Sequence, residues 1–471
     1  MTRRTQVAVI GSGAGGAVVA YTLAAAGLEV LLLEEGAQLS LDHGQPFSLA
    51  EMTGKYRHGG ISAAFGKPKI QYVEGRCLGG GTEINSGLYH RTPEQVLTKW
   101  QEVYGVEAIA LTDLEPHFQF CEQMVSVSYL PHQPPPASLK LKTGADQLGW
   151  ECVEVPRWYK YDAQAQGRKQ SMTETFIPLA VAQGCTLLTD TWVQKLKYQD
   201  RLWQIQARQQ SQPLTITAET VFVCGGAIQT PALLQRSGIT KNIGASLQMH
   251  PTVKVTARFP EEVNDRQMGV AVHQVKEFLP RFSFGCSISS PAYLALAMND
   301  HPAYAWEVDQ FWSRMAIYYA ALGSEVMGRG YIRSLPGFRD PLVKYQLEPQ
   351  GLQVLAEALS KLCELLLAAG AAAVYPSICG SDRLTKTSDL ANLPQTLPPH
   401  LTNLITVHLF SSCPMGENRQ RCATDSFGKV FNHQGLYICD ASLLCSALGV
   451  NPQGTIMAIA RRNALHFLGK R

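Results

Sequence analysis

The chain has 471 residues, a length that predicts two or more packed lobes rather than one compact unit. Hydrophobic residues make up 45% and charged residues 17%, which indicates either a large interior or an unusually apolar surface. The net charge of +3 and the lack of any extended basic run argue against binding to nucleic acid. The 12 cysteines are scattered without a CxxC pair, as is typical of reduced thiols in a cytoplasmic protein, and no apolar run is long enough to span a membrane.

The first elements of the chain form a strand–helix–strand unit. Val7–Ile10 is predicted to be a short buried strand, Ala14–Ala26 a helix that ends at Gly27, and Glu29–Leu33 a second apolar strand. Two strands joined by a helix over so short a stretch predict the start of a parallel sheet.

Later segments indicate a second kind of architecture. Pro131–Pro136 is expected to form a stiff connector where the chain crosses between domains. Lys195–Thr217 alternates polar and apolar residues and predicts antiparallel strands, and Val221–Cys224 predicts another buried strand. Strand-like segments recur between residues 254 and 348, and Gly351–Ala369 predicts an amphipathic helix with leucines along its buried face.

A glycine-rich loop, GSGAGG at residues 11–16, lies between the first strand and the first helix and matches G-x-G-x-x-G. Gly11 permits the tight turn, Gly13 lets the backbone approach a pyrophosphate, and Gly16 lets helix and strand pack closely. Glu34 ends the second strand, where a carboxylate can bind a ribose hydroxyl and would repel a 2′-phosphate. FAD and NAD both bind at such a loop, so the motif alone leaves the choice between them open.

Three further segments lie downstream: EGRCLGGGTEINSGLYHR (74–91), GGAIQTPALLQRSGI (225–239) and GLYICDASLLCSALGVNPQGTIMAIA (435–460). They resemble signatures of the glucose–methanol–choline (GMC) oxidoreductase family, whose members bind FAD. GASLQMHP (244–251) and SMTETFIPLA (171–180) are similar to two more segments of that family. The matches follow the order of the family along the whole chain, so the resemblance favours FAD over NAD.

The resemblance implies an α/β fold with two domains. One is a Rossmann-like FAD-binding domain with a parallel sheet, expected from residues 1–115, 181–253 and 400–471. The other is a discontinuous α+β substrate-binding domain built on an antiparallel sheet, expected from residues 116–180 and 254–399.

The family pattern also implies which residues contact FAD. The predicted contacts are Gly11, Ser12, Gly13, Gly16 and Glu34 for the AMP half, Val193 for the adenine, Arg76, Gly79, Gly80 and Asn85 for the pyrophosphate and flavin, Asp440 and Ala441 for the ribityl chain, and Asn451 and Pro452 for the flavin ring. Some family members link FAD covalently through a histidine just before the asparagine of the first signature. That position is Ile84 here, so non-covalent FAD is predicted.

Oxidation of an alcohol needs a base for the hydroxyl proton while hydride leaves the carbon for flavin N5. By its place in the family pattern, His408 in HLFSSCPMG (408–416) is the predicted general base, and Asn451 is predicted to orient the substrate oxygen. The segment departs from the family at Leu409-Phe410 and Ser411-Ser412, so Phe410 is expected either beside the substrate or in the core. The other interpretation of His408 is a packed core histidine.

A metal site is a weaker interpretation of the same region. His408, Cys413, Cys422 and His433 could be proposed as zinc ligands, but their spacings fit no common zinc site. The sequence therefore predicts no metal.

An aromatic-rich stretch, Tyr293–Tyr319, the low charge and the resemblance of the C-terminal half to long-chain alcohol oxidases and cholesterol-oxidase-like members favour a hydrophobic alcohol. A fatty alcohol, a sterol or a terpenoid is expected, and peripheral contact with a membrane is a linked hypothesis. Two other functions stay open: a GMC-fold enzyme without net redox, such as a lyase, isomerase or photodecarboxylase, and a flavin-binding protein without catalysis. Nothing in the sequence indicates the electron acceptor or the oligomeric state.

Overall fold

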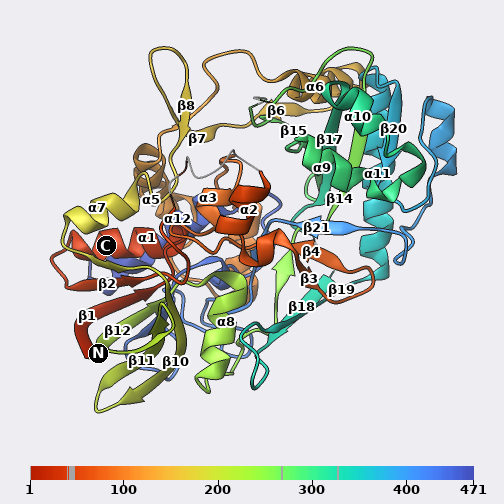
Figure 1. The fold of residues 1–471 in the computed structure, drawn as a ribbon. Helices are drawn as coiled ribbons and strands as arrows, with labels where there is room; N and C mark the ends of the chain where they lie inside the picture. Colours follow the sequence, from red (N-terminus) through yellow and green to blue (C-terminus); the bar gives the residue numbers. More distant parts are fainter. Residues whose placement is uncertain (1, 40, 42–47, 267–268, 326–327, 471) are drawn as a thin grey trace.

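The computed structural model describes residues 2–39, 41, 48–266, 269–325 and 328–470. Two large sheets lie side by side, and both termini are on the side of the first sheet (Figure 1). The predicted α/β fold, with a Rossmann-like part and an antiparallel sheet, is confirmed.

The first sheet has seven strands in the order β10-β11-β12-β1-β2-β9, with β23 also paired to β12. Strands β1, β2, β9, β12 and β23 are mutually parallel, and β10, β11 and β12 form an antiparallel meander. Their bounds are β1 Thr2–Ile10, β2 Val30–Leu33, β9 Thr186–Leu188, β10 Thr191–Gln199, β11 Leu202–Gln209, β12 Gln212–Val223 and β23 Leu436–Ile438. β1 starts earlier than the predicted Val7, because the polar residues Thr2–Thr5 pair with Thr215–Ala218 of the long strand β12.

Helices cover this sheet and contact one another. Helix α1 lies beside α7 and α12, and α12 contacts α5 (Figure 1). These helices and their neighbours are α1 Ala14–Ala24, α3 Gly81–Ile84, α4 Glu94–Tyr104, α5 Leu111–Met124, α7 Phe176–Ala182, α8 Gly226–Arg236 and α12 Gln453–Phe467. Helix α1 is buried along most of its length, so it is apolar almost all round rather than amphipathic.

The second sheet has nine strands in the order β3-β4-β21-β14-β17-β16-β15-β6, with β20 also paired to β14. Neighbours run antiparallel except β4 and β21. The bounds are β3 Ser62–Ala64, β4 Ile70–Tyr72, β6 Cys152–Glu154, β14 Thr252–Arg258, β15 His273–Val275, β16 Phe282–Cys286, β17 Met315–Leu322, β20 Ala373–Pro376 and β21 Leu404–Thr406. Strands β3, β4 and β21 belong to this sheet although they lie in the ranges expected for the FAD-binding domain. The division into two domains stays a prediction.

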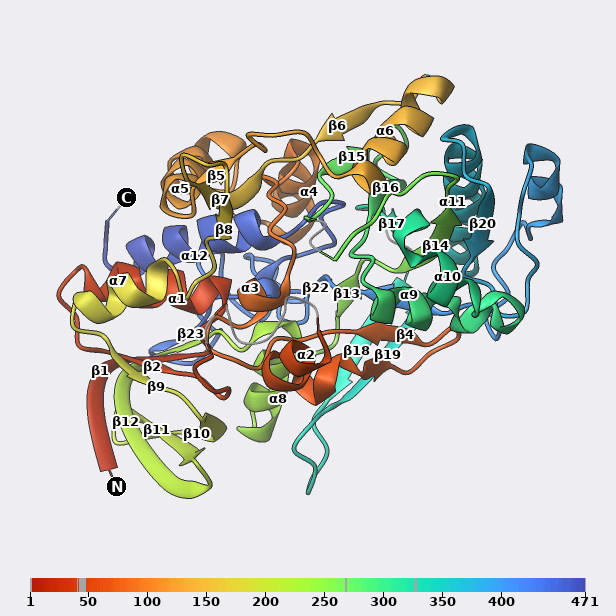
Figure 2. The same cartoon turned by 45° about the horizontal axis from the view of Figure 1, so that its top comes forward.

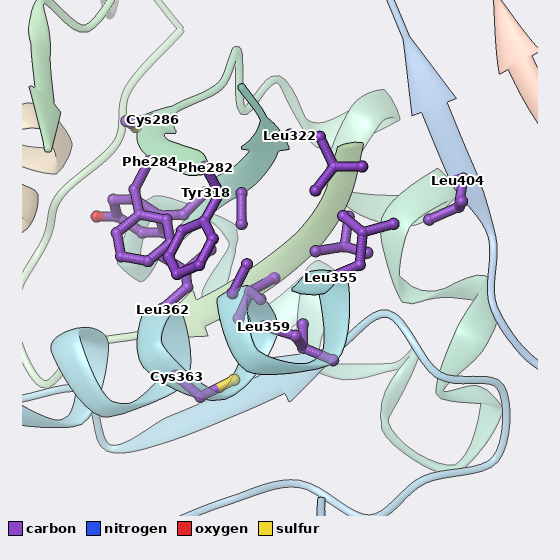
Figure 3. Close-up of a cluster of buried hydrophobic side chains, with 14 of the residues drawn as sticks. Phe282, Phe284, Cys286, Tyr318, Leu322, Leu355, Leu359, Leu362, Cys363 and Leu404 are labelled. Carbon is purple, nitrogen blue, oxygen red and sulfur yellow. The ribbon is translucent and has the colours of Figure 1, made fainter. Parts of the chain in front are cut away.

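Helix α11 (Pro349–Ala368) packs its leucine face on this sheet and builds the core of the second part. Leu355, Leu359 and Leu362 are fully buried in one apolar cluster with residues of the sheet; in Figure 3, Leu362 lies near Phe282 and Tyr318, and Leu355 lies on the side of Leu322. The leucines recur with the period of a helix, so they lie on one face of α11, and that face makes one continuous apolar contact with the sheet.

Shorter elements connect these parts. The prolines of 131–136 lead from β5 (Val127–Ser128) to α6 (Pro136–Leu148), which contacts α11 and β15. The remaining elements are α2 Leu49–Lys55, β7 Arg157–Tyr161, β8 Gly167–Lys169, β13 Gln248–Met249, α9 Pro291–Ala297, α10 Glu307–Phe311, β18 Gly328–Arg333, β19 Leu342–Leu347 and β22 Leu409–Phe410. In the described part of the chain, no helix combines the length and the apolar character needed to cross a membrane.

Candidate active site

The first glycine loop has the geometry that its sequence predicts. Gly11 has a φ of +104°, and a Cβ there would lie 2.3 Å from the carbonyl oxygen of Cys224. A Cβ on Gly16 would lie 1.9 Å from the Gly11 oxygen, so only glycine lets α1 approach β1. A Cβ on Gly13 would meet nothing within 4 Å, which leaves open space beside the N-terminus of α1. That combination is what a pyrophosphate requires.

Glu34, at the end of β2, ties this loop to the sheet. One of its carboxylate oxygens accepts from the Ser12 N–H (3.0 Å) and the Ser12 hydroxyl (2.6 Å), and the other accepts from the Gly36 N–H (2.8 Å). Burial raises the pKa of this carboxyl, and these hydrogen bonds act in the opposite direction. Oε2 already accepts two of these bonds, but Oε1 accepts only one and has further acceptor capacity, which suits the predicted ribose hydroxyl.

The second glycine-rich segment meets the first loop directly. The Gly79 N–H donates to the Ser12 hydroxyl at 2.9 Å, and a Cβ on Gly80 would lie 3.1 Å from the Cα of Gly13. Arg76 pairs its Nε with Glu35 at 3.3 Å and keeps a side-chain exposure of 42%. The structure therefore brings the two glycine segments together, as the sequence-based assignment requires.

The remaining predicted cofactor residues lie around the same loop. Asn85 donates from Nδ2 to the Gln453 Oε1 at 2.7 Å, which ties the second segment to the start of α12. A Cβ on Gly15 would lie 2.0 Å from the Cys439 oxygen, so α1 runs against the backbone that continues into Asp440 and Ala441. The Asp440 carboxylate is occupied by hydrogen bonds from Gly226, Thr230 and Ser442, so only its backbone is free for a ligand. Val193 is buried in β10, two residues beyond Thr191, whose N–H donates to the Glu34 carbonyl. Pro452 caps α12 immediately after Asn451.

These observations fit a flavin dinucleotide. Two glycine segments without Cβ atoms, a helix N-terminus and a buried carboxylate converge on one place. FAD would be held by the loop 11–16, Glu34, the segment 76–85 and the backbone at 440–441. The two residues predicted to contact the flavin ring, Asn451 and Pro452, lie where α12 begins.

The predicted catalytic pair is brought together. His408 lies in the turn between β21 and β22, and Asn451 lies just before α12. The Asn451 Nδ2 and the His408 Nε2 are 3.3 Å apart. Strand β22 pairs with β13, and this small sheet lies between the two large sheets (Figure 2). The pair therefore sits where the glycine-loop part and the antiparallel sheet meet.

Three further polar residues complete the surroundings of this pair. His250, which follows β13, places its Nδ1 3.0 Å from the His408 Nδ1, and its Nε2 accepts from the Gly449 N–H at 2.9 Å. Gln274 of β15 reaches from the antiparallel sheet to the Asn451 Oδ1 at 3.4 Å and to the Tyr319 hydroxyl at 3.3 Å. Side chains from the antiparallel sheet and from the segments beside β13 and β22 thus surround the His408–Asn451 pair.

The histidines of the site are neutral at neutral pH. Burial lowers the pKa of His408 to about 4, and the charge of Lys276 adds to this effect. Burial also lowers the pKa of His250 far below its ordinary value and that of His90 to about 3, again with help from Lys276. Burial lowers the pKa of Lys276 itself to about 8. A neutral imidazole has one N–H and one lone pair, so these rings can donate and accept.

Phe410 lies in the core. Its side chain is fully buried and its ring packs edge-on against His250, with centroids 4.9 Å apart. The aromatic stretch 293–319 also forms mostly core: Leu294, Met298 and Met315 are buried there with Tyr304, Phe311 and Trp312 around them. Tyr319 is the member of that stretch that reaches Gln274. Among the described residues, no group of three or more His, Cys, Asp or Glu could hold a metal ion.

Several residues of the site were missed by the sequence analysis. His250 stands in the family-like segment GASLQMHP and His90 stands in the first signature, so both had a signal but no assigned role. Gln274 and Lys276 are on strand β15 or just beyond it, and Tyr319 is on β17; no motif marks these three. Only the pairing of the antiparallel sheet brings Gln274 to Asn451 and Tyr319 to Gln274, with Lys276 near enough to act on the histidines.

Comparisons with known proteins show the family of the chain. GMC oxidoreductase family models match residues 52–252 and 328–460, and a model of an NAD(P)-binding Rossmann-like domain matches residues 9–45. The uncharacterized GMC-type oxidoreductase y4nJ of Sinorhizobium fredii is 38% identical to this chain over 97% of this chain and 93% of its own length. The long-chain-alcohol oxidase FAO3 of Arabidopsis thaliana is 25% identical over 97% of this chain and 67% of its own.

Solved structures share the fold. Pyridoxine 4-oxidase from Mesorbium loti superposes with a TM-score of 0.75 at 17% identity, covering 99% of this chain and 100% of its own. A formate oxidase of Aspergillus oryzae superposes with a TM-score of 0.76 at 14% identity, covering 98% of each chain. With a Rossmann-like dinucleotide site, a matching family model in both halves and a relative at 38% identity, the chain belongs to the GMC oxidoreductase family.

Proposed function

We propose that this chain is an FAD-dependent enzyme that oxidises an alcohol, with the alcohol oxygen bound between His408 and Asn451. The meeting of these two side chains at 3.3 Å, next to the start of α12, supports the proposal. An FAD bound at the glycine loops supplies a hydride acceptor, flavin N5. His408, Asn451 and their neighbours then bind the alcohol oxygen, orient the carbinol C–H bond and accept the hydroxyl proton.

The sequence predicts that His408 takes the hydroxyl proton. Because the pKa of His408 is low, its ring is neutral at neutral pH and has a lone pair that can accept a proton, which supports this role. His90 is a second neutral histidine near Asn451, so two rings of this site could accept a proton.

The proposed substrate is a hydrophobic alcohol such as a fatty alcohol, a sterol or a terpenoid. Similarity to long-chain-alcohol oxidases supports this class. The aromatic stretch does not add much support, because most of it builds core. Peripheral contact with a membrane goes with this class, and flotation with liposomes tests it: a protein that stays at the bottom of the gradient contradicts the contact.

Non-covalent FAD follows from Ile84 and is tested separately. Precipitation of the holoprotein with trichloroacetic acid is expected to leave the yellow flavin in the supernatant. Yellow colour in the pellet contradicts non-covalent binding.

Anaerobic flavin reduction tests the function. Purified holoprotein is mixed with alcohols of each class, and the loss of the visible absorbance of oxidised flavin is followed by stopped flow. Reduction is expected with at least one hydrophobic alcohol, and His408→Asn is expected to slow it by about 10²- to 10⁴-fold while FAD stays bound. If no alcohol reduces the flavin, the chain is instead a GMC-fold enzyme without net redox or a binding protein.

A further inference from the structure

Two histidines from distant parts of the chain, the buried His250 and the half-buried His408, share a hydrogen bond at the centre of the candidate site. The Nδ1 atoms of His250 and His408 are 3.0 Å apart, and Nε2 of His250 accepts from the backbone N–H of Gly449. We propose that the Gly449 N–H, acting through His250, holds His408 in the tautomer with its proton on Nε2, so that His408 meets the substrate oxygen as a hydrogen-bond donor. The inference rests on the proposed function and changes one role within it.

The orientation of the His250 ring is set by two contacts. A backbone N–H only donates, so Nε2 of His250, 2.9 Å from the Gly449 nitrogen, has no proton. Turning the ring over would place carbon atoms against both Gly449 and His408 and would lose both hydrogen bonds. A neutral His250 therefore carries its single proton on Nδ1, the atom that faces His408.

The proton of His408 follows by elimination. If Nδ1 of His408 also carried a proton, two N–H donors would face each other at 3.0 Å. Nδ1 of His408 therefore accepts from His250, and the one proton of a neutral His408 is on Nε2, toward Asn451. A backbone amide thus determines, across two rings, which atom the site presents to the substrate.

The charges around the pair keep both rings neutral. Burial is the main influence on each ring, and the next is positive charge from Lys276 on His408 and from His408 and Lys276 on His250. His90 is neutral as well. An additional proton on either ring would remove an acceptor from the chain of bonds that begins at Gly449.

The amide of Asn451 then has a defined orientation. A proton on the His408 Nε2 needs an acceptor, so the Asn451 Oδ1 faces His408 and its Nδ2 faces Gln274. The Oε1 of Gln274 is buried and has no partner among the described residues, so it can accept from that Nδ2 once the Gln274 amide turns as well. The two reversals keep a donor opposite an acceptor at both contacts, from His408 Nε2 to Asn451 Oδ1 and from Asn451 Nδ2 to Gln274 Oε1, and Gln274 Nε2 then takes the position that Oε1 held.

The hydroxyl proton needs a different acceptor in this arrangement. His90 Nδ1 is buried and has no partner among the described residues, and the His90 ring interacts with Asn451 and His408. In the balanced step the O–H proton would pass to His90 Nδ1, the C–H hydrogen would leave with its electron pair for the hydride acceptor that FAD supplies when bound, and the oxygen would become the carbonyl oxygen bound by the His408 N–H. His90 is thus the group that accepts the hydroxyl proton, and His250 is a positioning residue.

Nitrogen NMR of histidine-labelled holoprotein reads the tautomers without any substrate. Long-range correlations are expected to show a protonated Nε2 and an unprotonated Nδ1 for His408, and the reverse for His250. His408→Asn and His250→Asn assign the signals. A protonated Nδ1 on His408 would overturn the proposal, whether or not the protein oxidises alcohols.

Two isosteric variants separate the donor role from the base role. In His250→Asn the amide N–H still donates to the His408 Nδ1, so kcat/KM is expected to stay within about a factor of ten of the parent value. In His250→Asp the carboxylate accepts from that Nδ1 and moves the proton off Nε2, as an aspartate does to a triad histidine. Loss of one positioned donor is then expected to lower kcat/KM by about 100-fold relative to His250→Asn.

Whether kcat/KM is lower or higher in His250→Asp than in His250→Asn decides between the donor role and the base role of His408. If His408 were the base, His250→Asp would expose the Nε2 lone pair and raise kcat/KM above that of His250→Asn, which would overturn the proposal. His90→Gln, with FAD content and tautomers unchanged, is expected to lower kcat while KM changes little. If His90→Gln left kcat unchanged, His90 would not be the acceptor of the hydroxyl proton.

Discussion

At the scale of single residues, the candidate site is a set of neutral imidazoles held beside one buried amine. Lys276 follows strand β15, two residues after Gln274, so the two side chains lie on the same face of that strand. Its charge lowers the pKa of His90, His250 and His408 alike. The lysine therefore helps to keep the hydrogen-bond chain from Gly449 in its neutral form.

Replacement of Lys276 by Met is expected to move the acid limb of the pH–rate profile upward. Lys276 lowers the pKa of His408, so its removal raises that pKa, and His408 then becomes protonated at a higher pH. The rate of anaerobic flavin reduction against pH measures the shift. Lys254→Met is the control, because burial lowers the Lys254 pKa to about 8 as well but Lys254 does not act on these histidines. An unchanged acid limb in Lys276→Met contradicts the assignment.

His117 should make stability depend on pH without any role in the site. Burial and the charges of Arg461 and Arg462 lower its pKa to about 4 from an ordinary 6.5. The unfolded chain then binds a proton that the folded chain rejects, so the contribution is complete above pH 6.5 and is lost as the pH falls toward 4. His117→Gln is expected to flatten the fall of the melting temperature over that range. Equal slopes of the melting temperature against pH in the parent protein and in His117→Gln would contradict this prediction.

At the scale of elements, glycine positions decide whether α1 can approach the sheet. Gly16→Ala would put a Cβ 1.9 Å from the Gly11 oxygen, so the helix must move away and the pyrophosphate site is expected to be lost. Flavin content per protein after purification measures this. Gly27→Ala is the control: Gly27 follows the same helix and, unlike Gly16, has a left-handed φ of +86°, but its Cβ would meet nothing within 4 Å. Similar flavin contents in the two variants would rule out the close approach.

Helix α11 is expected to contribute to stability mainly through its buried leucines. Leu359→Ala removes a fully buried side chain from the contact with the antiparallel sheet and should cost ~2–5 kcal/mol of unfolding free energy. Denaturant unfolding followed by circular dichroism measures the loss. Gln353→Ala, at an exposed position of the same helix, is expected to change it little. Equal effects would mean that the leucine face is not packed as Figure 3 shows.

At the scale of the whole molecule, one cofactor would touch segments that are far apart in the chain. The predicted contacts come from residues 11–16, Glu34, 76–85, Val193, 440–441 and 451–452, so FAD should act as a common core for them. At a free FAD concentration of 100 Kd, binding to the folded state alone adds about 2.7 kcal/mol to the unfolding free energy. The melting temperature of FAD-stripped protein is expected to rise with added FAD and not with NAD. A rise with NAD instead would contradict the choice of FAD.

An ion-pair network also joins distant segments. Glu35, after β2, pairs with Arg57 at 2.7 Å, with Arg76 and with Arg339 from the loop between β18 and β19. These charges lower the pKa of Glu35 to about 2 despite its burial. The network connects the segment after β2 to the loop of the β18–β19 hairpin.

The sequence by itself determined the local chemistry of this protein. Glycine spacing, the apolar strand and Glu34 predict the dinucleotide loop, because a turn without Cβ atoms is a property of consecutive residues. The leucine period of α11 and the family-like position of His408 and Asn451 are likewise local signals, and the structure brings that pair together. The predicted strand Val7–Ile10 was shorter than β1, because the pairing with β12, and not the apolar pattern, sets where that strand begins.

Only the tertiary structure decided what surrounds the pair. Gln274, Lys276 and Tyr319 come from strands of the antiparallel sheet, whose pairing joins residues far apart in sequence. Phe410 turned inward because β22 pairs with β13 and presents its ring to His250. The bond from Gly449 to His250 exists only once the loop before α12 folds against β13, and the direction of that single N–H then fixes the protons of both histidines.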